Sequence, residues 1–284
     1  MKKLSKLMCL LLAVGMLMGI ASCSSDAGEG GGGSSGGTET VRISCGPLNG
    51  YQNVLYNSIA DMMNKANPGK YSFAIEASTG SAENARLLAM DETDFGTMGM
   101  DMTLSCYNAE GEFEGLPAEQ IMHVATHSGT GATVHVITSA KSDINSIPDL
   151  AGTKFGVTAG MMAGYLDDLA MSFGIKVVDI GQEAVDKLMA EKPWYHTVVI
   201  PVGTYDGCDE DITTFAQYTA LCARADVPEE TVYNLVKTMM ENADALEAVH
   251  KNAAGTCPER GIEGALIPMH PGAERYYKEV GVLD

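Results

Sequence analysis

The chain has 284 residues, of which 45% are hydrophobic, and its formal net charge is −19 at pH 7. This charge argues against binding to nucleic acid and against a basic surface that lies on a membrane, because both depend on clustered lysine and arginine. The length suits one large domain or two medium-sized ones, and the negative charge does not exclude a local site for a small anion.

The first 22 residues have the pattern of a secretion leader. Three lysines precede an apolar run over residues 7–20, which is too short to span a bilayer comfortably and is typical of a signal peptide. The small residues ahead of Cys23 resemble a bacterial lipobox. We therefore predict a lipoprotein signal peptide over residues 1–22 and lipid on Cys23, which would anchor the protein to the bacterial cell membrane outside the cytoplasm, in the periplasm or at the cell surface.

Residues 23–39 form a segment rich in glycine and serine. Such a composition cannot bury enough apolar surface to order itself, so we predict a flexible tether behind the lipid anchor. The folded part is expected to begin near Thr40. No later apolar run in the sequence is long enough to span a membrane.

Strand and helix patterns alternate in the first part of the chain. Residues 51–65 repeat apolar side chains at helical spacing, whereas residues 71–77 alternate apolar and polar side chains as a strand does. This alternation predicts parallel strands joined by crossover helices. The strands are expected at residues 41–45, 71–77 and 93–100, and the helices at residues 51–65 and 81–90.

The second part of the chain has the same mixture of elements. Residues 143–158 are predicted to form a turn, a short helix and a strand. The longest helical pattern covers residues 227–250, with Asp226 placed to cap it and Glu229 as the returning partner of a capping box. Further strands are expected at residues 132–138 and 213–223, and a further helix at residues 164–175.

Two loops at the ends of predicted strands are candidates for binding an anion. Residues 46–51 follow the first strand and residues 78–81 follow the second, and each loop leads into a helix. In a parallel sheet such loops share one edge, and unpaired N–H groups at a helix N-terminus attract carboxylate or phosphate. On these residues alone, ordinary capping by Thr79 or Ser81, with Glu83 in the first turn, remains the better-supported interpretation.

Signatures of catalysis and of metal binding are missing from the sequence. There is no GxSxG or HExxH, and the loop at residues 78–81 lacks the GK[ST] ending of a P-loop. His123 and His127 are expected to be structural or surface histidines. The acidic turn at residues 206–213 lacks EF-hand spacing, so a solvated turn is favoured over a calcium site. We therefore predict no metal, no cofactor and no enzymatic activity.

Five cysteines remain when Cys9 and Cys23 of the leader region are set aside. Their number is odd and none forms a CxxC pair, so the sequence implies no disulfide framework. Free buried thiols are favoured, with a Cys208–Cys222 disulfide as the alternative. The five are Cys45, Cys106, Cys208, Cys222 and Cys257.

The stretch STGSAENARLLAMDETDFGTM, at residues 78–98, resembles the segment that follows the second strand in solute receptors of the TAXI class of TRAP transporters. Four other blocks carry the same resemblance, and together they cover nearly all of residues 41–281. They are SDINSIPDLAGTKFGV at 142–157, PWYHTVVIPVGTYDG at 193–207, ARADVPEETVYNLVKTMMEN at 223–242 and IPMHPGAERYYKEVG at 267–281.

The resemblance implies a two-lobed α/β fold of the periplasmic-binding-protein type. Residues 40–136 would form the first part of lobe one, residues 137–221 a shortened lobe two, and residues 222–284 the return to lobe one with the C-terminal helices. Known members bind small carboxylates, such as glutamate or other organic acids, in the cleft. They deliver the ligand to a sodium-driven TRAP-type membrane permease.

The sequence departs from the family pattern in three places. A sizeable segment of lobe two is missing after Gly174, which leaves that lobe truncated. Residues 161–164 read Met-Met-Ala-Gly where the family usually has Gly-Ser-Gly-Thr. Residues 99–101 read Gly-Met-Asp in place of Gln-Ser-Asp, and the tyrosine that lines the family's cleft falls near Thr130.

Taken with the resemblance, the loops at residues 46–51 and 78–81 predict a site for a small organic anion, and capping becomes the weaker interpretation. Donors to a carboxylate are expected from the second loop and the helix after it, with further lining from the first loop. Asp101 would hold an amine if the ligand has one, or orient neighbouring donors. The predicted ligand-binding residues are Asn49, Tyr51, Ser78, Thr79, Gly80, Ser81, Asn84 and Asp101.

Two other functions remain open at this point. A degenerate receptor-like lipoprotein could act as a sensor or adaptor without transport, using the shortened lobe as a surface for protein contact. An enzyme on the same fold is the weaker alternative, because the sequence has no recognisable pair of nucleophile and base.

Overall fold

The computed structural model describes residues 38–127, 132–153, 156–159, 171–206 and 208–284. The predicted signal peptide, Cys23 and nearly all of the tether lie outside these residues. No helix in the described ranges is long and apolar enough to cross a membrane.

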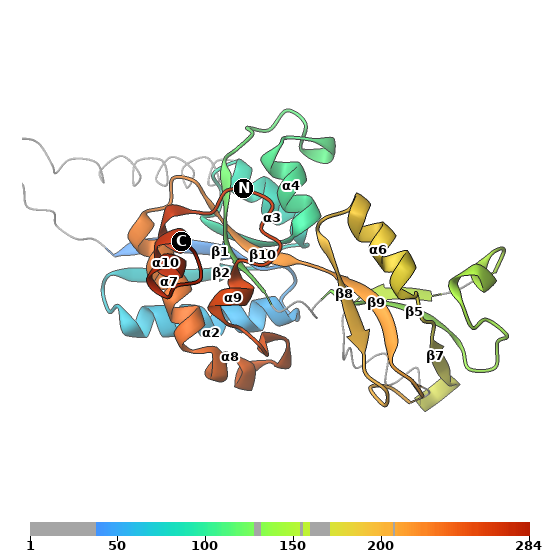
Figure 1. The fold of residues 1–284 in the computed structure, drawn as a ribbon. Helices are drawn as coiled ribbons and strands as arrows, with labels where there is room; N and C mark the ends of the chain where they lie inside the picture. The colour runs from blue at the N-terminus through green and yellow to red at the C-terminus, as the bar shows by residue number, and fades with distance from the viewer. Residues whose placement is uncertain (1–37, 128–131, 154–155, 160–170, 207) are drawn as a thin grey trace, which may run out of the picture. The chain divides into compact units, whose positions relative to one another are not determined.

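A five-stranded mixed sheet forms the centre of the first lobe (Figure 1). Its strands follow the order β2-β1-β3-β10-β4. β1 pairs in parallel with β2 and with β3, as the alternating pattern predicted, whereas β10 runs antiparallel between β3 and β4. The bounds are β1 Glu39–Ser44, β2 Tyr71–Glu76, β3 Phe95–Gly99, β4 Ile121–Thr126 and β10 Thr219–Arg224.

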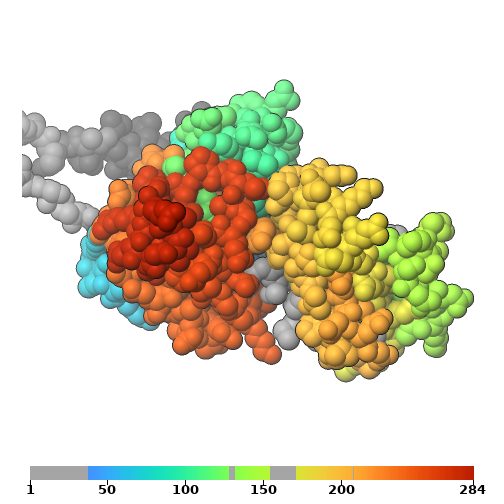
Figure 2. Space-filling model, in the orientation of Figure 1, coloured from blue at the N-terminus to red at the C-terminus, as the bar shows by residue number. Residues whose placement is uncertain are grey.

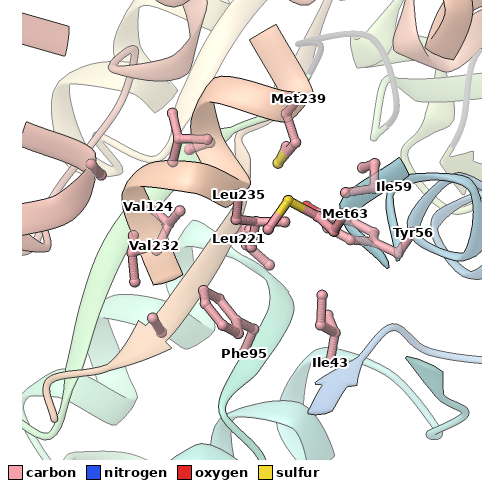
Figure 3. Packing of buried hydrophobic residues seen from close by; sticks show 14 of the residues in the cluster. Ile43, Tyr56, Ile59, Met63, Phe95, Val124, Leu221, Val232, Leu235 and Met239 are labelled. Atoms are coloured by element: carbon pink, nitrogen blue, oxygen red, sulfur yellow. The ribbon is translucent and has the colours of Figure 1, made fainter. Parts of the chain in front are cut away.

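One face of this sheet packs against helices α2 (Tyr51–Ala66) and α7 (Glu229–Glu241). Both helices present an apolar stripe to the strands, and the contact builds the largest hydrophobic core of the described residues. Figure 3 shows strand residues such as Ile43 and Phe95 facing Met63 of α2 and Leu235 of α7. Each of these side chains is fully buried.

The C-terminal elements cover this face of the sheet, where they appear orange to red in Figure 2. α10 packs on α7, and Gly272 at the start of α10 lies directly against the α7 backbone. The elements after α7 are α8 Ala243–Val249, the 3-10 helix η3 Lys251–Ala253, α9 Pro258–Gly261 and α10 Pro271–Glu279.

The opposite face of the sheet packs against α3 (Ser81–Ala89) and α4 (Met100–Tyr107). Leu88 of α3, Met98 of β3 and Phe113 of the 3-10 helix η1 (Gly111–Phe113) are buried together in this second core. Helices on both faces explain why β3 is buried along its whole length.

The second lobe contains two small antiparallel sheets. One has the order β6-β5-β7, and the other pairs β8 with β9. Helix α6 lies against β8. The bounds are β5 Val134–Ser139, η2 Ile147–Leu150, β6 Gly156–Ala159, β7 Ile175–Val177, α6 Gln182–Glu191, β8 Tyr195–Ile200 and β9 Ile212–Gln217.

The single strand predicted for residues 213–223 is wrong, because the structure has two strands separated at Tyr218. The N–H of Tyr218 donates to the carbonyl of Trp194, and its carbonyl accepts from the N–H of Met100. The chain therefore leaves the β8–β9 ribbon and joins the first sheet at this one residue. Neither the apolar composition nor the periodicity of this segment predicts that its pairing changes from β8 to β3 at Tyr218.

The helix predicted for residues 227–250 is also two helices, α7 and α8, which meet at Asn242. The Asn242 side chain donates to the carbonyl of Thr238, a local bond that competes with helix continuation. The predicted capping box is wrong as well. The Asp226 carboxylate accepts from Arg224 at 2.8 Å, and Pro228 occupies the N-cap position.

Several elements have no counterpart in the prediction, among them β4, α4, α6 and β8. Most of the helix predicted for residues 164–175 lies outside the described residues. The five cysteines of the described chain are free, and all except the half-buried Cys257 are buried, which excludes the Cys208–Cys222 disulfide.

Candidate ligand-binding site

Three helices begin at one edge of the first sheet. α2 follows β1, α3 follows β2, and α4 follows β3 without an intervening loop. Because β1 is parallel to both of its neighbours, the carboxyl ends of the three strands share that edge. The positive ends of three helix dipoles are therefore gathered in one place, in a chain whose net charge is −19.

Hydrogen bonds hold the two predicted loops together. The N–H of Ser78 donates to the carbonyl of Gly46 at 2.9 Å, and the N–H of Gly46 donates to the Ser78 hydroxyl at 2.9 Å. The same hydroxyl accepts from the N–H of Gly80 at 3.2 Å. Ser78 thus links the two loops, and its hydroxyl oxygen already accepts two hydrogen bonds from the protein.

Gly80 and Ser81 present unpaired donors at the start of α3. Gly80 has φ 127° and ψ −158°, a region that is essentially restricted to glycine. Beyond it, the N–H groups of Ser81 and Ala82 have no hydrogen-bond partner among the described residues. The Ser81 hydroxyl accepts from the N–H of Gly99 at 3.1 Å and so ties α3 to the end of β3.

Thr79 is hydrogen-bonded to the carboxylate of Glu83. Its N–H and its hydroxyl both donate to Glu83 Oε2, each at 2.6 Å. These two bonds lower the pKa of Glu83 and keep it ionised. The predicted capping by Thr79 or Ser81 is therefore wrong: Gly80 is the N-cap residue, and no side chain caps α3.

Two buried polar side chains lie below the start of α3 with part of their hydrogen-bonding capacity unused. Asn84 is fully buried and its Nδ2 donates to the Thr97 carbonyl at 2.7 Å, but its Oδ1 has no partner in the described residues. The buried hydroxyl of Ser44 likewise lacks a partner there.

The two side chains share one face of the sheet. Ser44 is the register partner of Gly96, and a Cβ atom at Gly96 would lie 3.3 Å from the Cβ of Asn84. Buried polar atoms without partners are costly, so a ligand or water is expected to complete this bonding.

Asp101 lies in the first turn of α4 and is half-buried. Its Oδ1 accepts from the N–H of Met102 at 2.6 Å. A Cβ atom at Gly99 would lie 2.8 Å from the same oxygen and 2.9 Å from Gln217 Nε2, so glycine keeps these two polar groups close together. The carboxylate could accept from an amine at this edge.

Asn49 lies in the first predicted loop, and Tyr51 lies at its end. Asn49 is exposed, whereas Tyr51 is half-buried as the first residue of α2. The Tyr51 ring lies 5.5 Å from the His250 ring. Burial raises the pKa of the Tyr51 hydroxyl to about 12, partly offset by a hydrogen bond with Gln52, so the hydroxyl stays protonated.

The two central histidines are structural, in agreement with the sequence-based expectation. His123 Nε2 donates to the Gly261 carbonyl at 3.0 Å, and His127 Nε2 shares a hydrogen bond of 2.9 Å with the Tyr56 hydroxyl. Burial lowers the pKa of each to about 4. Within the described ranges, no three His, Cys, Asp or Glu residues are grouped so as to hold a metal ion.

Sequence reasoning missed Ser44 and Gln217. The sequence gives only a weak indication of Ser44. The other buried positions of β1 are apolar, and Ser44 is the small polar residue at the end of that strand. The sequence gives no indication of Gln217, because the position of this residue follows from the break at Tyr218. Residues 161–164 and Thr130, where the sequence departs from the receptor pattern, lie outside the described residues.

Residues 43–159 and 155–281 match the NMT1-like family. Similar solved structures include the binding component of an ABC phosphonate transporter from Pseudomonas aeruginosa, with 11% identity, coverage of 78% of this chain and 80% of that chain, and a TM-score of 0.47.

Two further structures are similar at the same level. The periplasmic aliphatic sulphonate binding protein of Escherichia coli has 13% identity, coverage of 77% of this chain and 74% of that chain, and a TM-score of 0.46. A TRAP periplasmic solute binding protein from a Polaromonas species, bound to D-erythronate, has 13% identity, coverage of 86% and 92%, and a TM-score of 0.40. At such identities and TM-scores, the ligands of these proteins say nothing about the ligand of this chain.

The match to the NMT1-like family is stronger evidence than these structural similarities, because its two segments together span most of the chain. The family match is consistent with the mixed α/β architecture and with the expected fold of the periplasmic-binding-protein type. The chain belongs to the NMT1-like family and is homologous to periplasmic solute-binding proteins.

Proposed function

We propose that this protein is an extracytoplasmic solute-binding receptor that captures a small organic anion, a carboxylate or an amino acid. The observation that carries this proposal is the pair of unpaired N–H groups of Ser81 and Ala82, at the edge where three helices begin. Backbone donors at a helix N-terminus are suited to an anionic group. Below them, the unpaired Oδ1 of Asn84 can accept from an N–H or O–H group of the ligand, and the hydroxyl of Ser44 can donate or accept.

In the proposed complex, the acidic group of the ligand accepts from Ser81 and Ala82. Gly80 allows the close approach because it has no side chain. An amine of the ligand would be held by Asp101, while Asn49, Tyr51, Ser78 and Thr79 border the site. Ligand contacts with both lobes would stabilise a closed state through a hinge motion.

We further propose that the receptor is of the TAXI class and delivers its ligand to a TRAP-type permease. The sequence blocks quoted above support this assignment, as does the homology to periplasmic solute-binding proteins. Lipid on Cys23 and the tether at residues 23–39 would keep the receptor near its membrane partner, outside the cytoplasm.

Thermal unfolding in the presence of amino acids and dicarboxylates tests ligand binding. A ligand at a hundred times its dissociation constant is expected to add about 2.7 kcal/mol to the free energy of unfolding. Absence of a shift with every compound of such a panel would contradict a receptor for small organic anions.

Two substitutions at Ser81 separate the backbone donor from the side chain. Ser81→Pro removes the N–H at the first helical position, where proline is tolerated, whereas Ser81→Ala removes only the hydroxyl. We expect Ser81→Pro to weaken binding at least about tenfold more than Ser81→Ala, because a charge-assisted hydrogen bond is lost. Calorimetric titration with a ligand found in the panel measures the difference.

Gln182→Pro is the matched control, since Gln182 holds the first position of α6, whose N-cap is also a glycine. It is expected to leave affinity unchanged. Equal affinities of Ser81→Pro and Ser81→Ala would remove the N-terminus of α3 from the site.

The lipid anchor has a separate test. In cells grown with a labelled fatty acid, the wild-type chain is expected to carry the label and to sediment with membranes. Cys23→Ala is expected to abolish both, and Cys9→Ala serves as the control. Labelling that persists in Cys23→Ala would refute the assignment of Cys23.

A further inference from the structure

The outer edge of β2 is closed by a side chain from helix α2. β2 is the first strand in the sheet order and, among the described strands, pairs only with β1. The N–H of Phe73 donates to Asn64 Oδ1 at 2.9 Å, and Asn64 Nδ2 donates to the carbonyl of Phe73 at 3.4 Å. The side-chain amide of Asn64 thus offers Phe73 one acceptor and one donor, as the backbone of a neighbouring strand would.

These two backbone groups of Phe73 point away from the sheet. In a parallel pair, alternate residues of a strand bond to the same neighbour. The carbonyls of Lys70 and Glu76 accept from N–H groups at the start of β1 and just beyond its end. Even-numbered residues of β2 therefore face β1, and the N–H and carbonyl of Phe73 belong to the outer edge.

The opposite edge of the sheet is covered by main chain instead. β4 is the last strand in the sheet order. The N–H of His123 in β4 donates to the carbonyl of Pro268 at 2.9 Å, and the N–H of His270 donates to the carbonyl of His123 at 2.8 Å. Both edges of the first sheet are thus occupied, one by backbone and the other by the side chain of Asn64.

β2 itself has few of the features that keep edge strands from pairing. Such strands are commonly protected by lysine, by proline or by a bulge. Residues 71–75 read Tyr-Ser-Phe-Ala-Ile, without charge or proline, and the register with β1 is unbroken. Lys70 precedes the strand, and its ammonium lies 3.7 Å from Glu230 of α7. Short uncharged segments of high β-propensity pair readily with identical copies, so this edge depends on another form of protection.

The side chains next to Phe73 leave space for a second strand. Ser72 and Ala74 are small and exposed, whereas Phe73 between them is buried. The two small side chains leave the strand on the face opposite to that of Phe73, because side chains alternate along a strand. An incoming strand would therefore meet no bulky or charged side chain at the middle of β2.

We propose that β2 is a latent interface for a second copy of this chain, and that Asn64 keeps it closed. The outward N–H and carbonyl of Phe73 are already bonded, so a second β2 must displace the Asn64 amide before it can pair. Without that amide, two copies of β2 join edge to edge and extend the sheet across both molecules. This inference is independent of the ligand-binding site.

Asn64→Ala removes the amide and tests the proposal in the purified full chain, held in a detergent of matched density. Sedimentation equilibrium is expected to show a monomer for wild type at every concentration. Asn64→Ala is expected to self-associate, and its apparent mass should rise with concentration to at least about twice that of wild type.

Asn67→Ala is the matched control, because Asn67 lies one turn further along the chain and its Nδ2 donates to the Met63 carbonyl at 3.1 Å rather than to β2. This variant is expected to stay monomeric. Hydrogen exchange checks the contact itself. The amide of Phe73 is expected to exchange at least about tenfold faster in Asn64→Ala than in wild type or Asn67→Ala.

Ser72→Lys in the Asn64→Ala chain separates edge pairing from a loss of folding. Lysine on an edge strand opposes pairing, so the double variant is expected to return to a monomer although the bonds of Asn64 are not restored. Association caused by partial unfolding would persist in the double variant.

A monomeric Asn64→Ala chain would overturn the closing role of Asn64, as would a wild-type chain that associates equally strongly. Association that Ser72→Lys fails to reverse would overturn β2 as the interface. An unchanged exchange rate at Phe73 would show that the Asn64 amide does not hold this edge in solution.

Discussion

Gly272→Ala is expected to lower the free energy of unfolding by about 3 kcal/mol, because α10 packs on α7 backbone to backbone at this residue. A Cβ atom at Gly272 would collide with the carbonyl oxygen of Glu229 and would lie 2.8 Å from the backbone nitrogen of Tyr233. A flexible side chain could move aside, but the backbone of a buried helix cannot do so without shifting the core. Urea denaturation measures the loss, and in a domain of this size the melting temperature should fall by roughly 6 to 12 °C.

Lys278→Ala in the same helix is the control. The Lys278 ammonium lies 3.2 Å from Glu274 in an exposed pair, so its removal should change the free energy of unfolding by no more than about 0.5 kcal/mol. Equal stability of Gly272→Ala and wild type would show that α10 can move away from α7 without cost.

Acidification from pH 7.5 to pH 5 is expected to lower the free energy of unfolding by about 4 kcal/mol, through His123 and His127 together. Burial lowers the pKa of each from 6.5 to about 4 in the folded protein, and the charge of His123 adds to the effect on His127. Between these values the unfolded chain binds more protons than the folded one, so stability is present above pH 6.5 and is lost as the pH falls towards 4.

Urea denaturation at intervals of half a pH unit measures this dependence. The pKa values of His135 and His270 are also lowered by burial, so these residues act in the same direction. His127→Gln is expected to be less stable than wild type at pH 7.5 but to lose about half as much stability on acidification. A free energy of unfolding that stays constant from pH 7.5 to pH 5 would contradict neutral, buried histidines.

The parallel strands and the site edge could be predicted because they depend on local patterns. Alternation of residues 71–77 and helical spacing in residues 51–65 fix β2 and α2, and parallel strands then bring the loops at residues 46–51 and 78–81 together. The hydrogen bonds between Gly46 and Ser78 confirm this juxtaposition. The ligand-binding roles of the predicted residues remain predictions.

The partners of individual side chains could not be predicted, because they depend on which segments meet in space. Glu83 was expected in the first turn of α3, but nothing local indicates that it accepts both donors of Thr79. Asn84 was expected to face a ligand, and yet it also anchors α3 to the Thr97 carbonyl.

Tyr218 has a consequence for how the two lobes can move. The N–H of this residue is bonded to Trp194, next to β8, and its carbonyl is bonded to Met100, the first residue of α4. Rotation of the β8–β9 ribbon relative to the first sheet is therefore expected to change the torsion angles of Tyr218, because its two backbone hydrogen bonds lead to different parts of the fold. Because the Tyr218 carbonyl accepts from Met100, such a change is expected to move the first turn of α4, at the edge where the ligand is proposed to bind.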